Sequence, residues 1–432
     1  MNHFPQPSLV QNLSILLVAM LTAQPLSAAP PPAPPATVDF QFRDGDRVVM
    51  IGNTLVERAQ AYGHLETAIV ARLSGIRLTF RNLGWSGDTV RAESRGIFDP
   101  PAKGYQLMLD HVSRLKPTVL VLGYGSNESF SGDKGIPEFL ARYRKLISDL
   151  RKRSAPGTRV VILSIPPQQR PGLRRLNTAV PVTSKFTRSD LDVPIERNRQ
   201  IGRYNTALAN FALGDGHAHL DLNAPFQKLW DKPRRQFRLL FTVDGRALNS
   251  EGYRVATRGV LAQLFPTSTL AVQLKRGQPP QVTGPLATGG ATYQKRRLEF
   301  SSRFGPFVLQ VQGLRRGRYT LRIDGDNFGD HTAEEFAAGI APQFGEPGDK
   351  HAALRRAVIT KNRLYFHRWR PQNTTYLFGF RKREQGNNAT EVAEFEKLVA
   401  IQEAEIDRLK AKVLHRITGE PGRRPPTTIH AT

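Results

Sequence analysis

Short apolar runs alternate with longer amphipathic segments over the first half of the chain. The apolar runs predict strands at 47–52, 77–83, 118–123, 158–165 and 217–222. The segments between them, with apolar residues three or four positions apart, predict helices at 57–73, 105–115, 136–153 and 195–213. This alternation predicts an α/β domain over 45–265, in which helices cover both faces of a parallel sheet.

The pattern changes after about residue 265. Proline and glycine are dense over 266–290, and the alternation that follows predicts strands at 298–304, 307–311 and 318–323. We therefore predict a small antiparallel β module over 266–330. Helical patterns at 350–369 and 392–414 predict a helical region over 331–415, and the composition of 416–432 predicts a disordered tail.

The N-terminal residues have the composition of an export signal. An apolar run at 13–23 is followed by the small residues Ser27, Ala28 and Ala29, and then by prolines at 30–35. The run is too short to span a bilayer, but it has the length of a signal-peptide core with cleavage near Ala28 or Ala29.

We therefore predict a signal peptide at 1–29, a proline-rich linker at 30–44 and an exported protein, either periplasmic or secreted. The first ten residues carry no Lys or Arg, which keeps an uncleaved N-terminal membrane anchor as the alternative. We predict no other transmembrane segment.

Composition narrows the chemistry further. Lys and Arg number 62 against 37 Asp and Glu, and a formal charge of +25 favours anionic polymers as partners. The basic residues are spread along the chain without a nucleic-acid-binding motif, so no nucleic acid is expected. The absence of cysteine excludes disulfides, thiol catalysis and Cys-ligated metal.

Four short polar motifs carry the candidate chemistry. Three directly follow predicted strands, and all four are predicted to lie at one edge of the sheet, where the strands have their carboxyl ends. The motifs are Gly52-Asn53-Thr54, Ser86-Gly87-Asp88-Thr89, Gly125-Ser126-Asn127 and Asp244-Gly245-Arg246-Ala247. Each alone is a common loop sequence, so the prediction depends on their order, spacing and placement together.

These motifs resemble the four blocks of the SGNH (GDSL-type) hydrolase family, over about residues 45–262. The resemblance implies a flavodoxin-like three-layer α/β/α fold and an esterase without a cofactor, acting on a small-molecule or carbohydrate ester. It places Thr54 at the nucleophile, Gly87 and Asn127 at the oxyanion hole, and Asp244 at the carboxylate that orients the catalytic histidine.

Two positions depart from the family pattern. Asn53-Thr54 stands where the family has Asp-Ser, a form that resembles one bacterial branch, and Ala247 stands where the family has histidine. A threonine hydroxyl can be a nucleophile when a base is supplied, although its methyl group crowds the attack. Alanine cannot take a proton, and general base catalysis is worth roughly two to four orders of magnitude. The residues therefore predict weak hydrolysis.

His64, in the helix after Thr54, is the candidate surrogate base, although a half-buried or surface histidine is the simpler interpretation. Glu57 and Glu128 are interpreted as helix-end and loop carboxylates, and no metal site is predicted, because His64-x-Glu66 lacks a partner motif. Three hypotheses remain open: a weak ester hydrolase, a non-catalytic pseudoenzyme that binds a sugar or acyl ligand, and an interaction protein of the cell envelope.

Overall fold

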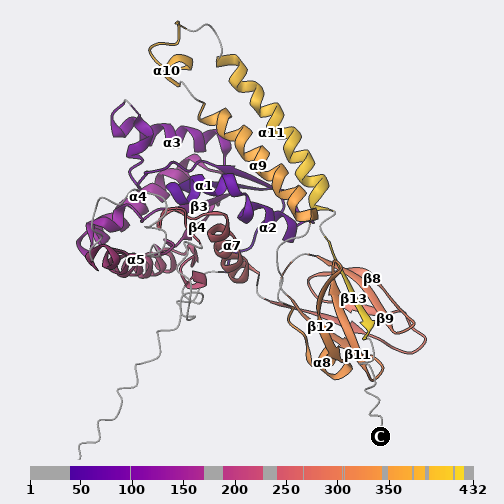
Figure 1. Cartoon of the computed structure of the whole chain (residues 1–432). Coiled ribbons are helices and arrows are strands. Elements are labelled where there is room, and N and C mark those ends of the chain that lie inside the picture. The colour runs from indigo at the N-terminus through magenta and orange to yellow at the C-terminus, as the bar shows by residue number, and fades with distance from the viewer. Residues whose placement is uncertain are drawn as a thin grey trace, which may run out of the picture. The chain divides into compact units, whose positions relative to one another are not determined.

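The computed structural model describes residues 39–97, 99–169, 188–226, 241–265, 267–303, 305, 307–342, 349–371, 374–384, 389–411 and 414–422 (Figure 1). The signal peptide predicted over 1–29 and most of the predicted linker lie outside these residues. Among the described helices, none is both long and apolar enough to cross a membrane.

A five-stranded parallel sheet forms the centre of the first domain, as the sequence predicted. Its strands, in the spatial order β2-β1-β3-β4-β5, are β1 (Asp46–Gly52), β2 (Leu78–Asn82), β3 (Val119–Gly123), β4 (Arg159–Leu163) and β5 (Ala218–Leu220). The central strands are continuous apolar runs because both faces of the sheet are covered. The order places β1 and β3 side by side, so the loops that follow them are neighbours.

Helices cover both faces of this sheet (Figure 1). On one face, α3 (Pro101–Leu115), α4 (Ile136–Arg153) and α5 (Arg188–Gly214) share a core with Ile51 and Leu122. On the other, α1 (Thr54–Tyr62), α2 (His64–Arg72) and α7 (Ser250–Leu264) pack with Met50 and Val121. Short 3-10 turns lie in the loops at Glu93–Gly96, Glu128–Ser131 and Asp133–Gly135. The three-layer α/β/α prediction is confirmed.

The helix predicted over 57–73 is two helices. Gly63 adopts a left-handed conformation with φ of 66°, which ends α1 and begins α2. The first of them begins at Thr54, three residues earlier than predicted, because the Asn53 side chain accepts a hydrogen bond from the Leu55 amide and caps the helix. This cap places Thr54 in the first turn of α1.

Two sheets build the β module. One has the order β10-β6-β7 and the other β12-β11-β13-β9-β8. The strands are β6 (Ser268–Gln273), β7 (Gln281–Thr283), β8 (Ala287–Gln294), β9 (Arg297–Arg303), β10 (Phe307–Gln312), β11 (Arg318–Ile323), β12 (Asp326–Thr332) and β13 (Leu414–Pro421), and a short helix α8 (Ala333–Ala338) packs on them. All pairings are antiparallel except that of β6 with β10.

The prediction of a disordered tail from residue 416 was wrong for its first residues, because β13 is the central strand of the larger sheet. It pairs with β11 on one side and with β9 on the other, and Ile417 is fully buried. Its sequence is short and flanked by Gly, Pro and Arg, so nothing local marks it as a strand. Residues 423–432 lie outside the described residues.

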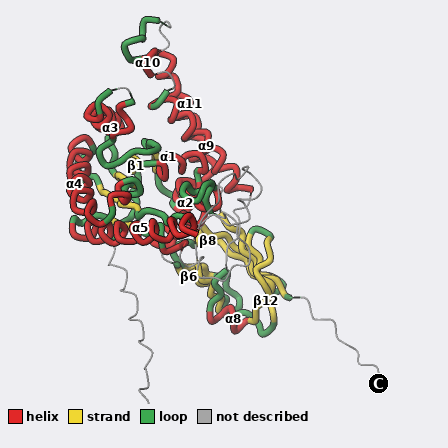
Figure 2. Tube along the Cα trace, turned by 60° about the vertical axis from the view of Figure 1, so that its left-hand side comes forward, coloured by secondary structure: helices red, strands yellow, loops and turns green. Residues whose placement is uncertain are grey.

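Two long helices, α9 (Asp349–Trp369) and α11 (Ala389–Lys410), lie side by side, with the short helix α10 (Thr374–Leu377) between them in the sequence (Figure 1). Helix α9 packs on α1 and α2. There the buried Lys361 ammonium donates to Glu66 at 2.7 Å, and Asn362 donates to the other oxygen of the same carboxylate. Figure 2 shows the contrast between the helix-rich first domain and the β module.

Candidate active site

A cavity of about 260 Å³ lies at the carboxyl ends of β1, β3 and β4. Its walls come from four loops and from the helices α1, α5 and α7. The lining residues are Asn53, Thr54, Leu55, Arg58, Gly123, Tyr124, Ser126, Asn127, Phe130, Ser164, Ile165, Pro166, Gln168, Ile201, Asp244, Arg246, Ala247, Leu248 and Tyr253. Three of the four predicted motifs therefore contribute to one cavity. The remaining motif, Ser86-Gly87-Asp88-Thr89, approaches the cavity through Gly87.

Thr54 enters the cavity from the first turn of α1. Its hydroxyl accepts a hydrogen bond from the Gly87 amide at 3.3 Å. The preceding residue, Asn53, is buried, and its side-chain amide donates to the Ser126 hydroxyl at 2.8 Å. Asparagine at this position therefore ties the first motif to the third. Within the described part of the chain, no basic side chain bonds to the Thr54 hydroxyl.

Gly87 and Asn127 are the two candidate oxyanion donors. Gly87 has φ of 79°, a conformation that favours glycine, and this backbone turn directs its N–H at the Thr54 hydroxyl. The Asn127 amide donates to the Asp88 carbonyl at 3.0 Å. An amide nitrogen carries two hydrogens, so the second remains for a ligand in the cavity. Both donors can polarise a carbonyl next to Thr54.

Glu128 holds the two oxyanion loops together. One of its carboxylate oxygens accepts from the Val90 amide and the other from the Gly125 amide, each at 2.9 Å. Burial raises the pKa of this carboxyl, although the backbone donors oppose the shift. Glu128 is thus a loop carboxylate, as interpreted from the sequence, and it positions the loops of the second and third motifs.

A buried ion pair supports the same loops. The Asp88 carboxylate accepts from Arg95 at 2.6 Å, and both side chains are almost completely inaccessible to solvent. Arg95 also donates to the Leu83 carbonyl, and the Tyr124 hydroxyl lies 3.4 Å from the carboxylate. Burial raises the pKa of Asp88, and Arg95 acts in the opposite direction. Because Asn127 donates to the Asp88 carbonyl, this pair fixes one candidate oxyanion donor.

Asp244 and Ala247 line the cavity from the loop that precedes α7. One oxygen of Asp244 accepts from the amides of Arg246 and Ala247, at 2.9 and 2.8 Å. Burial alone would raise the pKa of this carboxyl, but these amides hold it below its ordinary value. Asp244 is thus ionised and stabilised by its own loop. The Ala247 methyl group lines the cavity where the family pattern has an imidazole.

His64 does not line the cavity. Its Nε2 lies 3.0 Å from the Ser250 hydroxyl, and burial, together with Arg355 and Arg254, lowers its pKa to about 4. The ring is therefore neutral at pH 7, as a base must be, but this position gives it no contact with Thr54. Its role as a surrogate base stays a prediction without geometric support.

Sequence reasoning did not identify one support of the site, which comes from outside the four motifs. Glu57 accepts from the Ser86 amide at 2.5 Å and from Arg370 at 3.0 Å. The Arg370 guanidinium also stacks on the Trp85 ring at 3.4 Å. Ser86 directly precedes Gly87. Arg370, which lies just beyond α9, therefore helps to hold a candidate oxyanion donor in place through Glu57. One sequence signal is that residues 370–386 resemble the tail of the bacterial branch of the family whose first block reads Gly-Asn-Thr.

The cavity can polarise a carbonyl and present a hydroxyl to it, but the described residues of its lining include no histidine and no glutamate. Its one carboxylate, Asp244, is bound by backbone amides. Among the described residues, no group of three or more His, Cys, Asp or Glu side chains is placed to hold a metal ion. The described side chains therefore supply electrophilic assistance without an evident base.

Comparison with known proteins gives one family and one fold. Residues 50–255 match the GDSL-like Lipase/Acylhydrolase family. Among solved structures, BT4096, a gut microbial diltiazem-metabolizing enzyme, is similar with a TM-score of 0.56 and 15% identity, over 89% of this chain and 100% of that chain. This likeness shows that the fold is shared beyond the α/β domain.

Two further structures are similar over about half of this chain. Axe2, an acetylxylan esterase from Geobacillus stearothermophilus, has 14% identity and a TM-score of 0.36, over 53% of this chain and 97% of its own. LAE5, an alpha/beta hydrolase from the metagenome of Lake Arreo, has 19% identity and a TM-score of 0.36, over 52% and 96%. No curated protein sequence matches the chain.

Proposed function

Residues 50–255 belong to the GDSL-like Lipase/Acylhydrolase family, and on this premise we propose that the Thr54 cavity is an acyl-ester site with weak hydrolytic activity. One observation carries the proposal. The cavity keeps a hydroxyl and two oxyanion donors around one point, while the family's histidine position is the methyl group of Ala247. The substrate that we propose is the ester of a carbohydrate or another small molecule.

In the proposed reaction, the ester carbonyl oxygen accepts hydrogen bonds from the Gly87 amide and the Asn127 side chain. The Thr54 oxygen then attacks the carbonyl carbon and loses its proton as the new bond forms. The ester C–O bond breaks, the alcohol leaves with a proton, and water hydrolyses the acyl-Thr54 intermediate to the carboxylic acid. With no imidazole at Ala247, water is left to take the proton, which forfeits roughly two to four orders of magnitude in rate. The retained donors still lower the barrier, so a residual rate is expected.

A non-catalytic pseudo-esterase is the second candidate, and Ala247 also favours it. Alanine enlarges the cavity where the base would stand, and Asp244 is stabilised by its own loop without an imidazole partner. Such a cavity can bind a sugar or acyl ligand without turning it over. The two candidates share the site and differ only in turnover.

Initial rates on 4-nitrophenyl acetate separate the two candidates. We expect slow release of nitrophenol by the wild-type protein and release at the uncatalysed rate by Thr54→Ala. Equal wild-type and Thr54→Ala rates would favour the pseudo-esterase. Fast wild-type turnover that is lost in Thr54→Ala would contradict weak activity and indicate an unrecognised base, with His64→Ala as the next variant.

We also propose that the protein is exported. The support is the apolar run at 13–23 and the small residues 27–29, which lie outside the described residues. N-terminal sequencing of the native protein should find a start at, or within a residue of, Ala29 or Pro30, in the periplasm or medium. A start at Met1 or Asn2 would contradict cleavage and leave an N-terminal anchor or a cytoplasmic protein.

A further inference from the structure

Two arginines lie at the mouth of the Thr54 cavity. Arg58 is on α1, one helical turn after Thr54, and Arg246 is in the loop that carries Asp244. Both side chains line the cavity and both residues are exposed. Within the described part of the chain, neither guanidinium has a hydrogen-bond or ion-pair partner, so both can receive a ligand.

The charges around the cavity do not balance. Among the described residues of the lining, Asp244 is the one carboxylate against two arginines; two backbone amides bind it, and the charge of Arg58 also lowers its pKa. Behind the wall, Arg197 stacks on Phe130 at 3.6 Å, and burial and the nearby Arg246 lower the pKa of Arg197. The cavity therefore has a positive mouth, in addition to the neutral donors around Thr54.

We infer that the ligand of this cavity is a carboxylate-bearing carbohydrate or small molecule whose oxoanion is bound by Arg58 and Arg246. This inference rests on the proposed function and narrows its substrate class. A guanidinium presents N–H groups in a planar fork that matches a carboxylate. A volume of about 260 Å³ is at the lower end for small-molecule sites, so it suits one sugar ring or a short acyl group.

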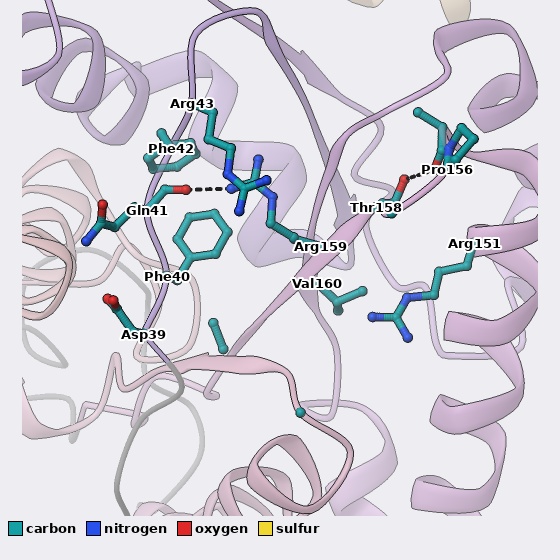
Figure 3. A pocket seen from close by; sticks show the side chains of 14 residues that line it. Asp39, Phe40, Gln41, Phe42, Arg43, Arg151, Pro156, Thr158, Arg159 and Val160 are labelled. Atoms are coloured by element: carbon teal, nitrogen blue, oxygen red, sulfur yellow. Dashed lines mark hydrogen bonds between the residues drawn. The ribbon is translucent and has the colours of Figure 1, made fainter.

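A second basic cavity provides the comparison that this inference needs. It measures about 650 Å³, lies at the amino ends of β4 and β5, and is lined by Arg43, Arg151 and Arg159 (Figure 3). Arg159 is bound by Asp46 at 2.5 Å and by the Gln41 carbonyl. The described lining of this cavity includes neither Thr54 nor the candidate oxyanion donors. A ligand that is bound through positive charge alone would therefore bind to this second cavity as well.

The test uses two probes that differ at one carbon, 4-nitrophenyl β-D-glucuronide and 4-nitrophenyl β-D-glucoside. Their affinities for the full chain are measured by saturation-transfer NMR or titration calorimetry. We expect the glucuronide to bind about tenfold more tightly, because each charged hydrogen bond contributes at that scale. Added NaCl should weaken the binding of the glucuronide and leave the binding of the glucoside unchanged, because the arginines are exposed to solvent.

Four variants locate the effect. Arg58→Gln and Arg246→Gln should each remove most of the glucuronide's advantage while leaving glucoside affinity unchanged. Arg276→Gln removes the same charge from an exposed turn of the β module and should change nothing. Arg151→Gln reports on the second cavity. Circular dichroism and thermal unfolding confirm that each variant is folded.

The outcomes distinguish this inference from the proposed function. Equal affinity for the two glycosides, or no binding of either at millimolar concentration, would overturn the inference. Loss of glucuronide binding in Arg151→Gln, with Arg58→Gln unaffected, would also overturn it by placing the ligand elsewhere. None of these results bears on the proposed function, which is decided by the ester rates of wild type and Thr54→Ala.

Discussion

The two sides of the cavity are built very differently. The oxyanion side is braced by buried groups, with Glu128 bridging two loops, Asp88 paired with Arg95, and Arg370 supporting the loop before Gly87. The Asp244 side is an exposed loop whose carboxylate is held by its own backbone. In the proposed ester site, the oxyanion side therefore depends on long-range contacts between buried groups, whereas the side that carries Ala247 is held by local hydrogen bonds.

The largest effect on activity should come from restoring a histidine on the Asp244 side of the cavity. We expect Thr54→Ser with Ala247→His to raise the rate on 4-nitrophenyl acetate by roughly two to four orders of magnitude over wild type. Each single change should give far less, because nucleophile and base act as a unit. Initial rates of all four proteins test this, and a folded double variant without a gain would show that the cavity has been remodelled for binding.

Disrupting the buried ion pair on the oxyanion side should change the free energy of unfolding by a nearly comparable amount. Arg95→Met leaves the Asp88 carboxylate buried without its partner, and we expect a loss of about 3–5 kcal/mol in the free energy of unfolding. Arg91→Met removes an exposed arginine nearby, paired with Glu138, and should cost at most about 1 kcal/mol. Urea unfolding measures both, and similar losses in the two variants would contradict a bracing role for the buried pair.

A smaller effect is expected from the support that comes from beyond α9. Arg370→Gln removes the hydrogen bond to Glu57 and the stacking on Trp85, and should destabilise the protein by about 1–3 kcal/mol. In the Thr54→Ser, Ala247→His background it should lower kcat more than it changes KM, because it disturbs an oxyanion donor. The matched control is Arg381→Gln, whose arginine pairs with Glu384 on the surface. An unchanged kcat would show that Arg370 is structural only.

The smallest effect is the pH-dependent contribution of Asp244 to the stability of the protein. The folded-state pKa of Asp244 is lowered, so its contribution to stability is present above the unfolded pKa and is lost as pH falls through the folded value. Asp244→Asn should therefore lower the free energy of unfolding slightly at pH 7, and the difference should disappear once the pH has fallen below the lowered folded-state pKa. Urea unfolding from pH 2.5 to 7 measures it, and a constant difference would contradict a role for the charge.

Local pattern was enough to predict the sheet and the motifs at its edge. The strands are continuous apolar runs, and strand-end geometry placed Thr54 and Asn127 at one edge of the sheet. The expectation for Asp244 came from the resemblance to the family, because no predicted strand directly precedes it. The supports of the site could not be predicted in the same way. Glu57 and Arg370 are more than 300 residues apart, and no local pattern states that one binds the other.

The rim arginines show a different limit of sequence reasoning. In a chain with 62 Lys and Arg, the positions of Arg58 and Arg246 do not stand out. Only the fold places them at the same opening, the first because it follows Thr54 by one helical turn and the second because its loop faces that helix. Composition therefore predicted an anionic partner, a prediction that stays untested, and it did not predict where in the structure such a partner would bind.

The position of β13 has a consequence for how the protein is made. The strand lies between β9 and β11, which do not pair with each other, so it joins two halves of the larger sheet. Along the chain it comes after every other described helix and strand, and after the two long helices that separate it from β12. During synthesis, β9 and β11 must therefore wait with open edges until their shared neighbour emerges. A chain cut short before residue 414 would keep those edges exposed, ready to pair with other molecules.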